Sequence, residues 1–165
     1  MISCLIGPVD ADFPGKARLA AQATLALRAA RRGDDAAALA HASENVRDLV
    51  MLLFGECGVL VSALGDGGTT PVKVQVFDDE GSEVSIDQAD PPVRTAVRTL
   101  LAEMHGNTDD ARQHVAIALD NAEPEEVDSL VLQALRWTIR LAGECVDRDL
   151  DVPDWITDAL ADDEP

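Results

Sequence analysis

Two stretches of this chain carry the same apolar pattern, and that repetition limits the folds open to it. In 46–64 and again in 127–145, apolar residues recur at offsets of 0, 3, 4, 7, 8, 11, 14, 15 and 18, with Thr138 as the one polar exception. This spacing fills one face of an α-helix along its whole length. We therefore predict two long amphipathic helices, the first beginning near Glu44, at corresponding places in two similar units.

Shorter helices are expected before each long one. The first unit is predicted over 15–64 and opens with a helix from Gly15 to Arg32. Gly33 ends this helix, and Asp34 is placed to cap a short helix that reaches Ala42. Two helices joined by so short a turn are expected to pack as an antiparallel pair.

The second unit, over 91–147, follows the same order. Its predicted helices cover 93–104, 109–119 and a long segment after Glu123, where Pro124 suits a first helical turn. The chain is therefore expected to be mainly α. Its two three-helix units form an antiparallel helical bundle or a short stack of helical hairpins.

Between the two units the pattern changes from helical to alternating. Valines alternate with other residues over 72–76, and Val84 and Ile86 alternate beyond a glycine-containing turn. This is typical of a β-hairpin, which we predict over 72–87. An isolated two-stranded hairpin is marginal in water, so its valine face must pack on the helices, pair with another chain, or both. Homodimerisation through the hairpin is one of these alternatives.

Length and composition suit a single domain over 1–165, because 47% of the residues are apolar. A short helix is expected over 153–160, where Trp155 either docks on the body or anchors a partner, and the acidic tail 161–165 is expected to fray.

Cysteine use and hydropathy bear on the compartment. Cys4, Cys57 and Cys145 are odd in number and far apart, and the last two lie in apolar helical patterns, which indicates buried reduced thiols. The opening residues lack the basic start of a secretion signal, and no apolar run is long enough to cross a membrane. We expect a cytoplasmic protein without a membrane span.

The formal net charge of −18 is the strongest compositional signal. Acidic residues concentrate in 78–90 and 144–164, and such a charge repels nucleic acid and anionic lipid. Direct nucleic-acid binding is therefore not expected. Arginine far exceeds lysine, which is typical of GC-rich bacterial coding.

The stretch Gly106–Pro124 resembles the second-helix signature of tetratricopeptide-type (TPR-like) repeats. Gly106 is followed at the family's intervals by the small residue Ala111 and the bulky Val115, and the turn Gly33–Ala42 follows part of the same pattern. Small residues let paired helices approach closely. The resemblance implies helical hairpins and, with them, binding of a protein partner whose identity the sequence does not give.

Recognised catalytic motifs are missing from the sequence. There is no phosphate-binding loop, dinucleotide-binding motif, nucleophile elbow or zinc-binding cysteine pair, and the glycine-rich run Gly65–Gly68 lacks a following lysine and helix. We therefore expect no catalytic residue, no cofactor and no metal site.

Two polar groups nevertheless contain metal-ligating residue types. On a continuous helix, His41, Glu44 and Asp48 are spaced to face one ion. A second group surrounds a predicted turn and comprises Glu103, His105, Asp109, Asp110 and His114. A solvated helix face and a capped turn with a surface salt bridge explain both groups without a metal.

Three classes of function follow. The leading one is a non-catalytic interaction or adaptor protein of the bacterial cytoplasm, expected to form a homodimer. The second is an acidic inhibitor that imitates nucleic acid or occupies a basic site on a partner. The third is a helical metal-binding protein or enzyme that uses His41 and Glu44, or His105 and His114.

Overall fold

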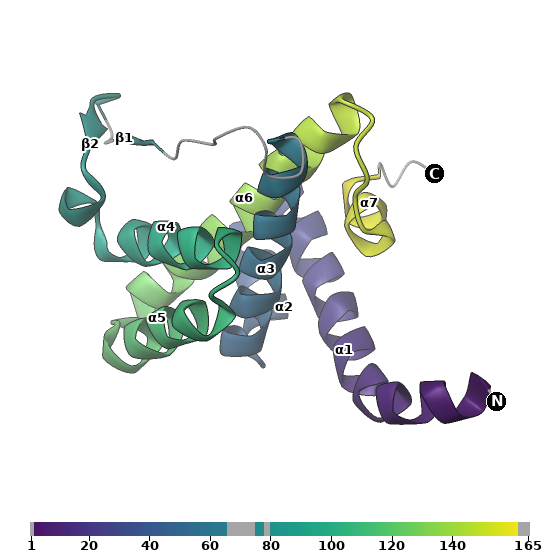
Figure 1. Cartoon of the computed structure of the whole chain (residues 1–165). Coiled ribbons are helices and arrows are strands. Elements are labelled where there is room, and N and C mark those ends of the chain that lie inside the picture. Colours follow the sequence, from purple (N-terminus) through teal and green to yellow (C-terminus); the bar gives the residue numbers. More distant parts are fainter. Residues whose placement is uncertain (1, 66–74, 78–79, 162–165) are drawn as a thin grey trace.

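The computed structural model describes residues 2–65, 75–77 and 80–161, with side chains from residue 17 onward. The first half of the chain forms three helices, α1 (Ile2–Arg31), α2 (Asp35–Ala42) and α3 (Val46–Leu64) (Figure 1). The turn before α2 needs Gly33, whose φ of 81° is a conformation open to glycine. Asp34 then caps α2, as predicted, by accepting a hydrogen bond from the N–H of Ala37 at 3.1 Å.

Helix α1 begins earlier than predicted, at Ile2 rather than Gly15. Pro8 and Pro14 favour the later start, but a proline removes the helical hydrogen bond of one turn and can bend a helix without ending it. The ribbon of α1 bends in this N-terminal part, which extends away from the other helices (Figure 1).

The second half contains α4 (Pro91–Met104), α5 (Thr108–Asn121) and α6 (Pro124–Asp147), followed by the short α7 (Asp154–Leu160). These helices confirm the predicted order, with ends that differ by a few residues. Helix α6 starts with a capping box. The Glu123 side chain accepts a hydrogen bond from the Glu126 backbone N–H, and the Glu126 side chain accepts one from the Glu123 backbone N–H.

The β-hairpin is much shorter than predicted. Strand β1 (Val76–Phe77) pairs antiparallel with β2 (Glu83–Val84), with Val76 opposite Val84. Ile86, predicted to continue the second strand, instead starts the 3₁₀ helix η2 (Ile86–Gln88). The predicted residues 72–74 and 78–79 lie outside the described part of the chain. The alternating pattern identified the hairpin but not its length, because apolar side chains at the same spacing also pack from a 3₁₀ turn.

Helices α3 and α6 pack against each other at the centre of the molecule (Figure 1). Their facing residues, among them Leu53, Phe54 and Leu135, are fully buried. Cys57 Sγ lies 3.3 Å from Thr138 Oγ1, and these residues are 81 positions apart, the same offset that relates the two sequence patterns. Corresponding positions of the two long helices therefore meet, as they do on a two-fold axis.

The shorter helices follow the same approximate symmetry, but across the two halves. Helices α1 and α2 pack on each other and mainly on α6. Helices α4 and α5 pack on each other and on α3, and α4 also packs extensively on α6, the long helix of its own half. At an offset of 73 positions, Ala23 and Ala96 are both fully buried, as are Ala38 and Ala111. Each half thus completes the core of the other, and the two predicted units do not form separate cores.

Each half also ends in a segment that covers the first helix of the other half. Helix α7 packs on α1, where the Thr24 hydroxyl donates to the Trp155 carbonyl at 3.5 Å and Ile156 is fully buried. The hairpin and η2 cover α4 through a cluster that contains Val76 and Val97, and Val97 is the counterpart of Thr24 at the offset of 73. The hairpin's valine face therefore packs on the helices.

In the part of the chain that is described, no helix is long and apolar enough to cross a membrane.

Candidate functional site

The approximate symmetry breaks at the second helix of each half. Helix α2 has 8 residues and α5 has 14, so α5 continues past the point at which α2 ends. In the first half, the Gln22 side chain donates a hydrogen bond of 2.8 Å to the His41 carbonyl and ties α1 to the end of α2. In the second half, the extra turns of α5 form one wall of an open cleft instead.

This cleft lies between α4, α5 and the start of α6 and has a volume of about 380 Å³. We call it the α4–α6 cleft. Its lining residues come from all three helices and are Pro91, Pro92, Arg94, Thr95, Arg98, His114, Ile117, Ala118, Leu119, Asn121, Ala122, Glu126, Val127 and Leu130. Apolar side chains supply most of the lining, with a few polar groups among them, which is the usual composition of a binding cleft.

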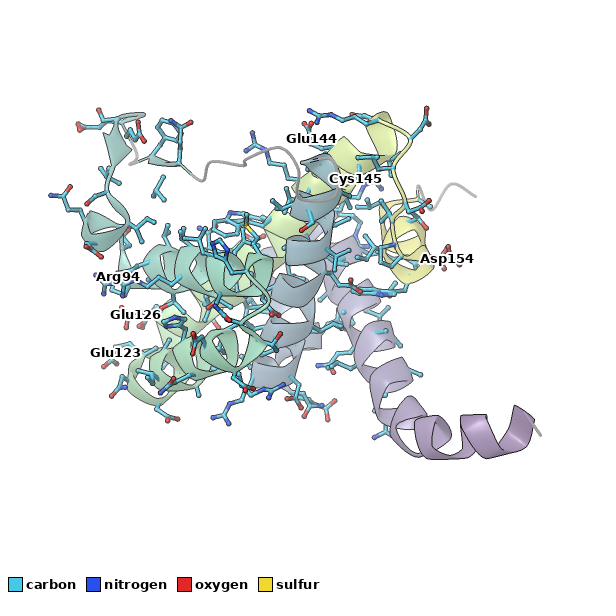
Figure 2. The ribbon with its side chains drawn as sticks, viewed as in Figure 1. Arg94, Glu123, Glu126, Glu144, Cys145 and Asp154 are labelled. Carbon is cyan, nitrogen blue, oxygen red and sulfur yellow. The ribbon has the colours of Figure 1, made fainter. Side chains whose placement is uncertain are left out.

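Basic side chains line the α4 side of the cleft, although the chain as a whole is strongly acidic. Arg98 forms an ion pair of 2.5 Å with Asp87, and Arg94 donates a hydrogen bond of 3.3 Å to the Asp87 carbonyl. These contacts hold both arginines against η2. Figure 2 shows Arg94 on the side of the molecule where Glu126 and Glu123 mark the start of α6.

The α5 side contributes an exposed apolar residue and a histidine. Ile117 is 54% exposed, whereas Val115 on the core face of the same helix is fully buried. His114 is half-buried and lines the cleft across from α4. An exposed isoleucine beside a cleft is a surface that water solvates poorly, so covering it with a ligand is favourable.

The first polar group, His41, Glu44 and Asp48, is not brought together as a possible metal site would need. His41 lies near the end of α2, Glu44 lies in the link and Asp48 lies on α3, because the helix that the prediction assumed is interrupted at 43–45. Across the described ranges, no group of three or more His, Cys, Asp or Glu residues is placed to hold a metal ion.

The second predicted group is divided between two places. Thr108 donates a hydrogen bond to Glu103 at 2.9 Å, and Asp109 forms a surface ion pair of 3.8 Å with Arg112, a residue outside the group that the sequence singled out. Asp109 is in the first turn of α5, not at its N-cap, which is Asn107. His114 lies in the α4–α6 cleft.

The two described thiols are buried in the core, as predicted. Burial raises the pKa of Cys57 to about 12 and also raises the pKa of Cys145. A thiol that stays protonated is a poor nucleophile. The side chain of Cys4 and the residues 66–68 of the glycine-rich run lie outside the described part of the chain.

The two tryptophans contact other helices of the same chain. Trp137 is half-buried and packs edge-on against Phe54, with ring centroids 6.0 Å apart. Trp155 on α7 hydrogen-bonds the Glu56 carboxylate on α3. Burial raises the pKa of Glu56, and this hydrogen bond partly opposes the shift.

Sequence reasoning did not single out Arg94, Arg98 or Ile117. Two signals could have found them. The arginines are four residues apart on one helix in a chain with only 13 basic residues, and Ile117 falls outside the apolar stripe of α5. Their convergence with α6 depends on the tertiary packing.

No protein-family model matches this chain, and comparisons with curated proteins and with solved structures gave no match.

Proposed function

We propose that this chain is a non-catalytic protein-interaction protein that binds an apolar helical or peptide segment in the α4–α6 cleft. The observation that carries the proposal is Ile117, which is 54% exposed on the rim of an open, mostly apolar cleft. Amphipathic segments bind such grooves through apolar side chains at positions i, i+3, i+4 and i+7.

Charge contributes little to the proposed binding. Arg98 is paired with Asp87, and the acid Glu126 lines the same cleft as Arg94, so apolar contacts are expected to supply most of the affinity of a bound segment. The resemblance of Gly106–Pro124 to TPR-like hairpins points to the same kind of function, and we propose the bacterial cytoplasm as its setting.

Peptide selection tests this proposal. Peptides selected from a displayed library on the immobilised full chain are titrated by calorimetry against the wild type, Ile117→Asp and Val59→Asp. Val59 is 60% exposed on α3 and does not line the cleft, so it is a matched control. Affinity should fall about tenfold or more in Ile117→Asp, because its carboxylate would be buried by the ligand, and stay unchanged in Val59→Asp.

Two results contradict the proposal. One is that the library yields no binding peptide, and the other is that bound peptides lose equal affinity in both variants. Circular dichroism of each variant establishes that the helices are intact before affinities are compared.

A second candidate function is an acidic inhibitor of a basic protein. Six exposed acids lie along the last turn of α6, the following link and α7, at Glu144, Asp147, Asp149, Asp151, Asp154 and Asp158. Arg148 in this stretch pairs with Glu144 at 3.3 Å. Figure 2 labels Glu144 and Asp154 on this end of the molecule, away from the cleft.

Salt dependence separates the two candidates. Binding of a basic protein to the acidic end should weaken steeply as salt rises and should be unaffected by Ile117→Asp. Binding of an apolar segment in the cleft should depend weakly on salt and be lost in that variant.

A further inference from the structure

Three helix ends in this molecule make the same backbone turn. After α1, α4 and α6, two backbone N–H groups donate to carbonyls of the last helical turn in the pattern of a Schellman motif, at 2.8 to 3.1 Å. The residue that takes a positive φ in each turn is Gly33, Gly106 or Asp149, with φ of 81°, 76° and 59°. Among the described residues, Asp149 is the one non-glycine with a positive φ. A Cβ makes this conformation unfavourable, so the turn after α6 is strained where the other two are not.

The strained turn leads to α7, a short helix at the edge of the molecule (Figure 1). Residues 148–153, which we call the hinge, connect α6 to α7. Helix α7 has 7 residues, too few to be stable alone in water. Its Ile156 and Ala159 are buried, and Arg28 of α1 donates a hydrogen bond of 3.2 Å to the Asp158 carbonyl. An α7 that leaves its place therefore needs another surface with the same groups.

We propose that two copies of this chain exchange α7, so that α7 of each copy packs on α1 of the other. A surface that fits α7 is present in every copy, because α7 already covers it within its own chain. The exchange therefore keeps the contacts of α7 and changes only the hinge. Two chains that exchange α7 reciprocally form a closed dimer. The α4–α6 cleft takes no part in this contact, so the inference goes beyond the proposed function and is independent of it.

The hinge decides how readily the exchange occurs. In the single chain, Asp149 keeps a positive φ where the chain turns back toward α1 (Figure 1). In the exchanged dimer the hinge extends toward the other copy, and Asp149 takes an ordinary negative φ. Release of strain in two hinges opposes the entropy that the two copies lose when they associate. Val146 is 48% exposed in the last turn of α6, and the second copy would cover it.

Charge opposes this dimer and makes it depend on salt. Residues 144–158 contain six exposed acids and one base, Arg148, so each copy brings net negative charge to the hinge. Repulsion between the two copies weakens as salt rises, because salt screens exposed charges. The dimer fraction should therefore increase with salt, whereas a dimer held by ion pairs would dissociate.

Light scattering after size exclusion measures the exchange in the full chain. The wild type should change from 17.5 kDa toward twice that mass as its concentration rises. Asp149→Gly removes the strain from the closed turn and should raise the dimer dissociation constant about tenfold or more, because two hinges contribute. Asp149→Asn also removes the charge but keeps a side chain at the strained position, so it should dimerise at least as well as the wild type.

Two further variants test the direction of the effect. Asp149→Pro should lower the dimer dissociation constant, because proline cannot take a positive φ and lacks the N–H that donates to the Val146 carbonyl at 3.1 Å. Gly106→Asp is the matched control, since it places the same strain in a turn that does not lead to α7. An added Cβ there meets no atom within 4 Å, so this variant should lower stability and leave the dimer unchanged.

Isotope-filtered NMR identifies the contact that forms the dimer. In a dimer of one labelled and one unlabelled chain, the Ile156 methyl groups of one copy should show contacts to α1 of the other. The inference is wrong if the wild type stays monomeric up to its solubility limit, if Asp149→Gly does not weaken the dimer, or if all Ile156 contacts lie within one chain. A dimer that dissociates as salt rises also overturns it.

These outcomes are separate from those of the proposed function. Ile117→Asp, which tests the cleft, should leave the dimer unchanged, and Asp149→Gly should leave peptide binding in the cleft unchanged. If peptides bind the cleft but α7 is not exchanged, only the inference fails. If α7 is exchanged but no peptide binds the cleft, only the proposed function fails.

Discussion

The two halves of the molecule share one plan and differ in one helix. Each half has a long helix at the centre, a helical pair that packs on the other half's long helix, and a terminal segment that covers the other half's first helix, and in the second half α4 packs on its own long helix as well. The first half ends its second helix after 8 residues and is closed there by the bond from Gln22 to the His41 carbonyl. The second half extends that helix to 14 residues and opens a cleft.

This difference shows how a repeated architecture gains a specific surface. The residues that follow the symmetry are mostly buried and serve the core. The cleft residues Ile117, Leu119 and Asn121 belong to the extension of α5, which has no counterpart in α2. Binding is therefore expected where the symmetry is broken.

The largest expected effects concern the shared centre. Phe54 and Leu135 occupy equivalent positions in α3 and α6, and both are fully buried. Phe54→Ala should lower the free energy of unfolding by about 3 to 5 kcal/mol and Leu135→Ala by about 2 to 5 kcal/mol, because each leaves a cavity. Urea unfolding followed by circular dichroism measures both. A cost below about 1 kcal/mol for either would contradict the symmetric core, and exposed Val59→Ala is the control.

A smaller contrast is expected between the two covering segments. Ile156 of α7 is fully buried, and Ile156→Ala should cost about 2 to 5 kcal/mol. Val76 of the hairpin is 9% exposed, and Val76→Ala should cost about 1 to 2 kcal/mol, since fewer methyl groups leave the core. Unfolding in urea gives both values, and hydrogen exchange should rise in α1 for the first variant and in α4 for the second. The reverse pattern would contradict the assignment of α7 as the cover of α1 and of the hairpin as the cover of α4.

The starts of the long helices should differ by about 1 kcal/mol. Glu126 accepts a hydrogen bond from the Glu123 N–H at 3.0 Å, and Glu126→Ala should cost about 1 kcal/mol by breaking this capping box. Asn45, at the corresponding position before α3, makes no side-chain capping bond, so Asn45→Ala should have little effect. If thermal unfolding shows that Glu126→Ala and Asn45→Ala lose the same stability, the two helix starts do not differ in capping.

The smallest expected effect depends on pH and concerns the link between α3 and α7. Burial raises the folded-state pKa of Glu56 above its ordinary value of 4.5. The stability that this carboxyl contributes is therefore full below pH 4.5 and is lost as pH rises through the folded-state pKa. Glu56→Gln keeps an acceptor for Trp155 and should be more stable than the wild type at pH 7, with the difference disappearing toward pH 4.5. Urea unfolding at both pH values measures this, and a difference independent of pH would contradict the assignment.

The local sequence predicted the bounds of some elements accurately and those of others poorly. Patterns in 46–64 and 127–145 identified α3 and α6 because the buried residues of an amphipathic helix recur at the helical period along its whole length. The hairpin was found but overestimated, because Ile86 packs in the same cluster as Val84 from a 3₁₀ turn. The early start of α1 was missed because Pro8 and Pro14 suggested a later start, and a proline can bend a helix without interrupting it.

The candidate site was largely beyond sequence reasoning. Of the polar residues that the sequence singled out, His114 reaches the α4–α6 cleft, whereas His41, Glu44 and Asp48 are separated by a break between helices. Arg94 and Ile117 gave no motif, because neither residue type is distinctive until a tertiary neighbour is known. The alternative reading of His41, Glu44 and Asp48 as metal ligands needed a continuous helix, and the helix is broken between them.

By itself, the sequence determined the order of the α-helices and, for α2 to α7, their approximate bounds and buried faces, because these properties depend on residues three or four positions apart. The tertiary structure alone decided that each half completes the core of the other and that the longer α5 opens a cleft. Those features depend on contacts such as the one between Cys57 and Thr138, 81 positions apart, and no local pattern specifies which distant faces will meet.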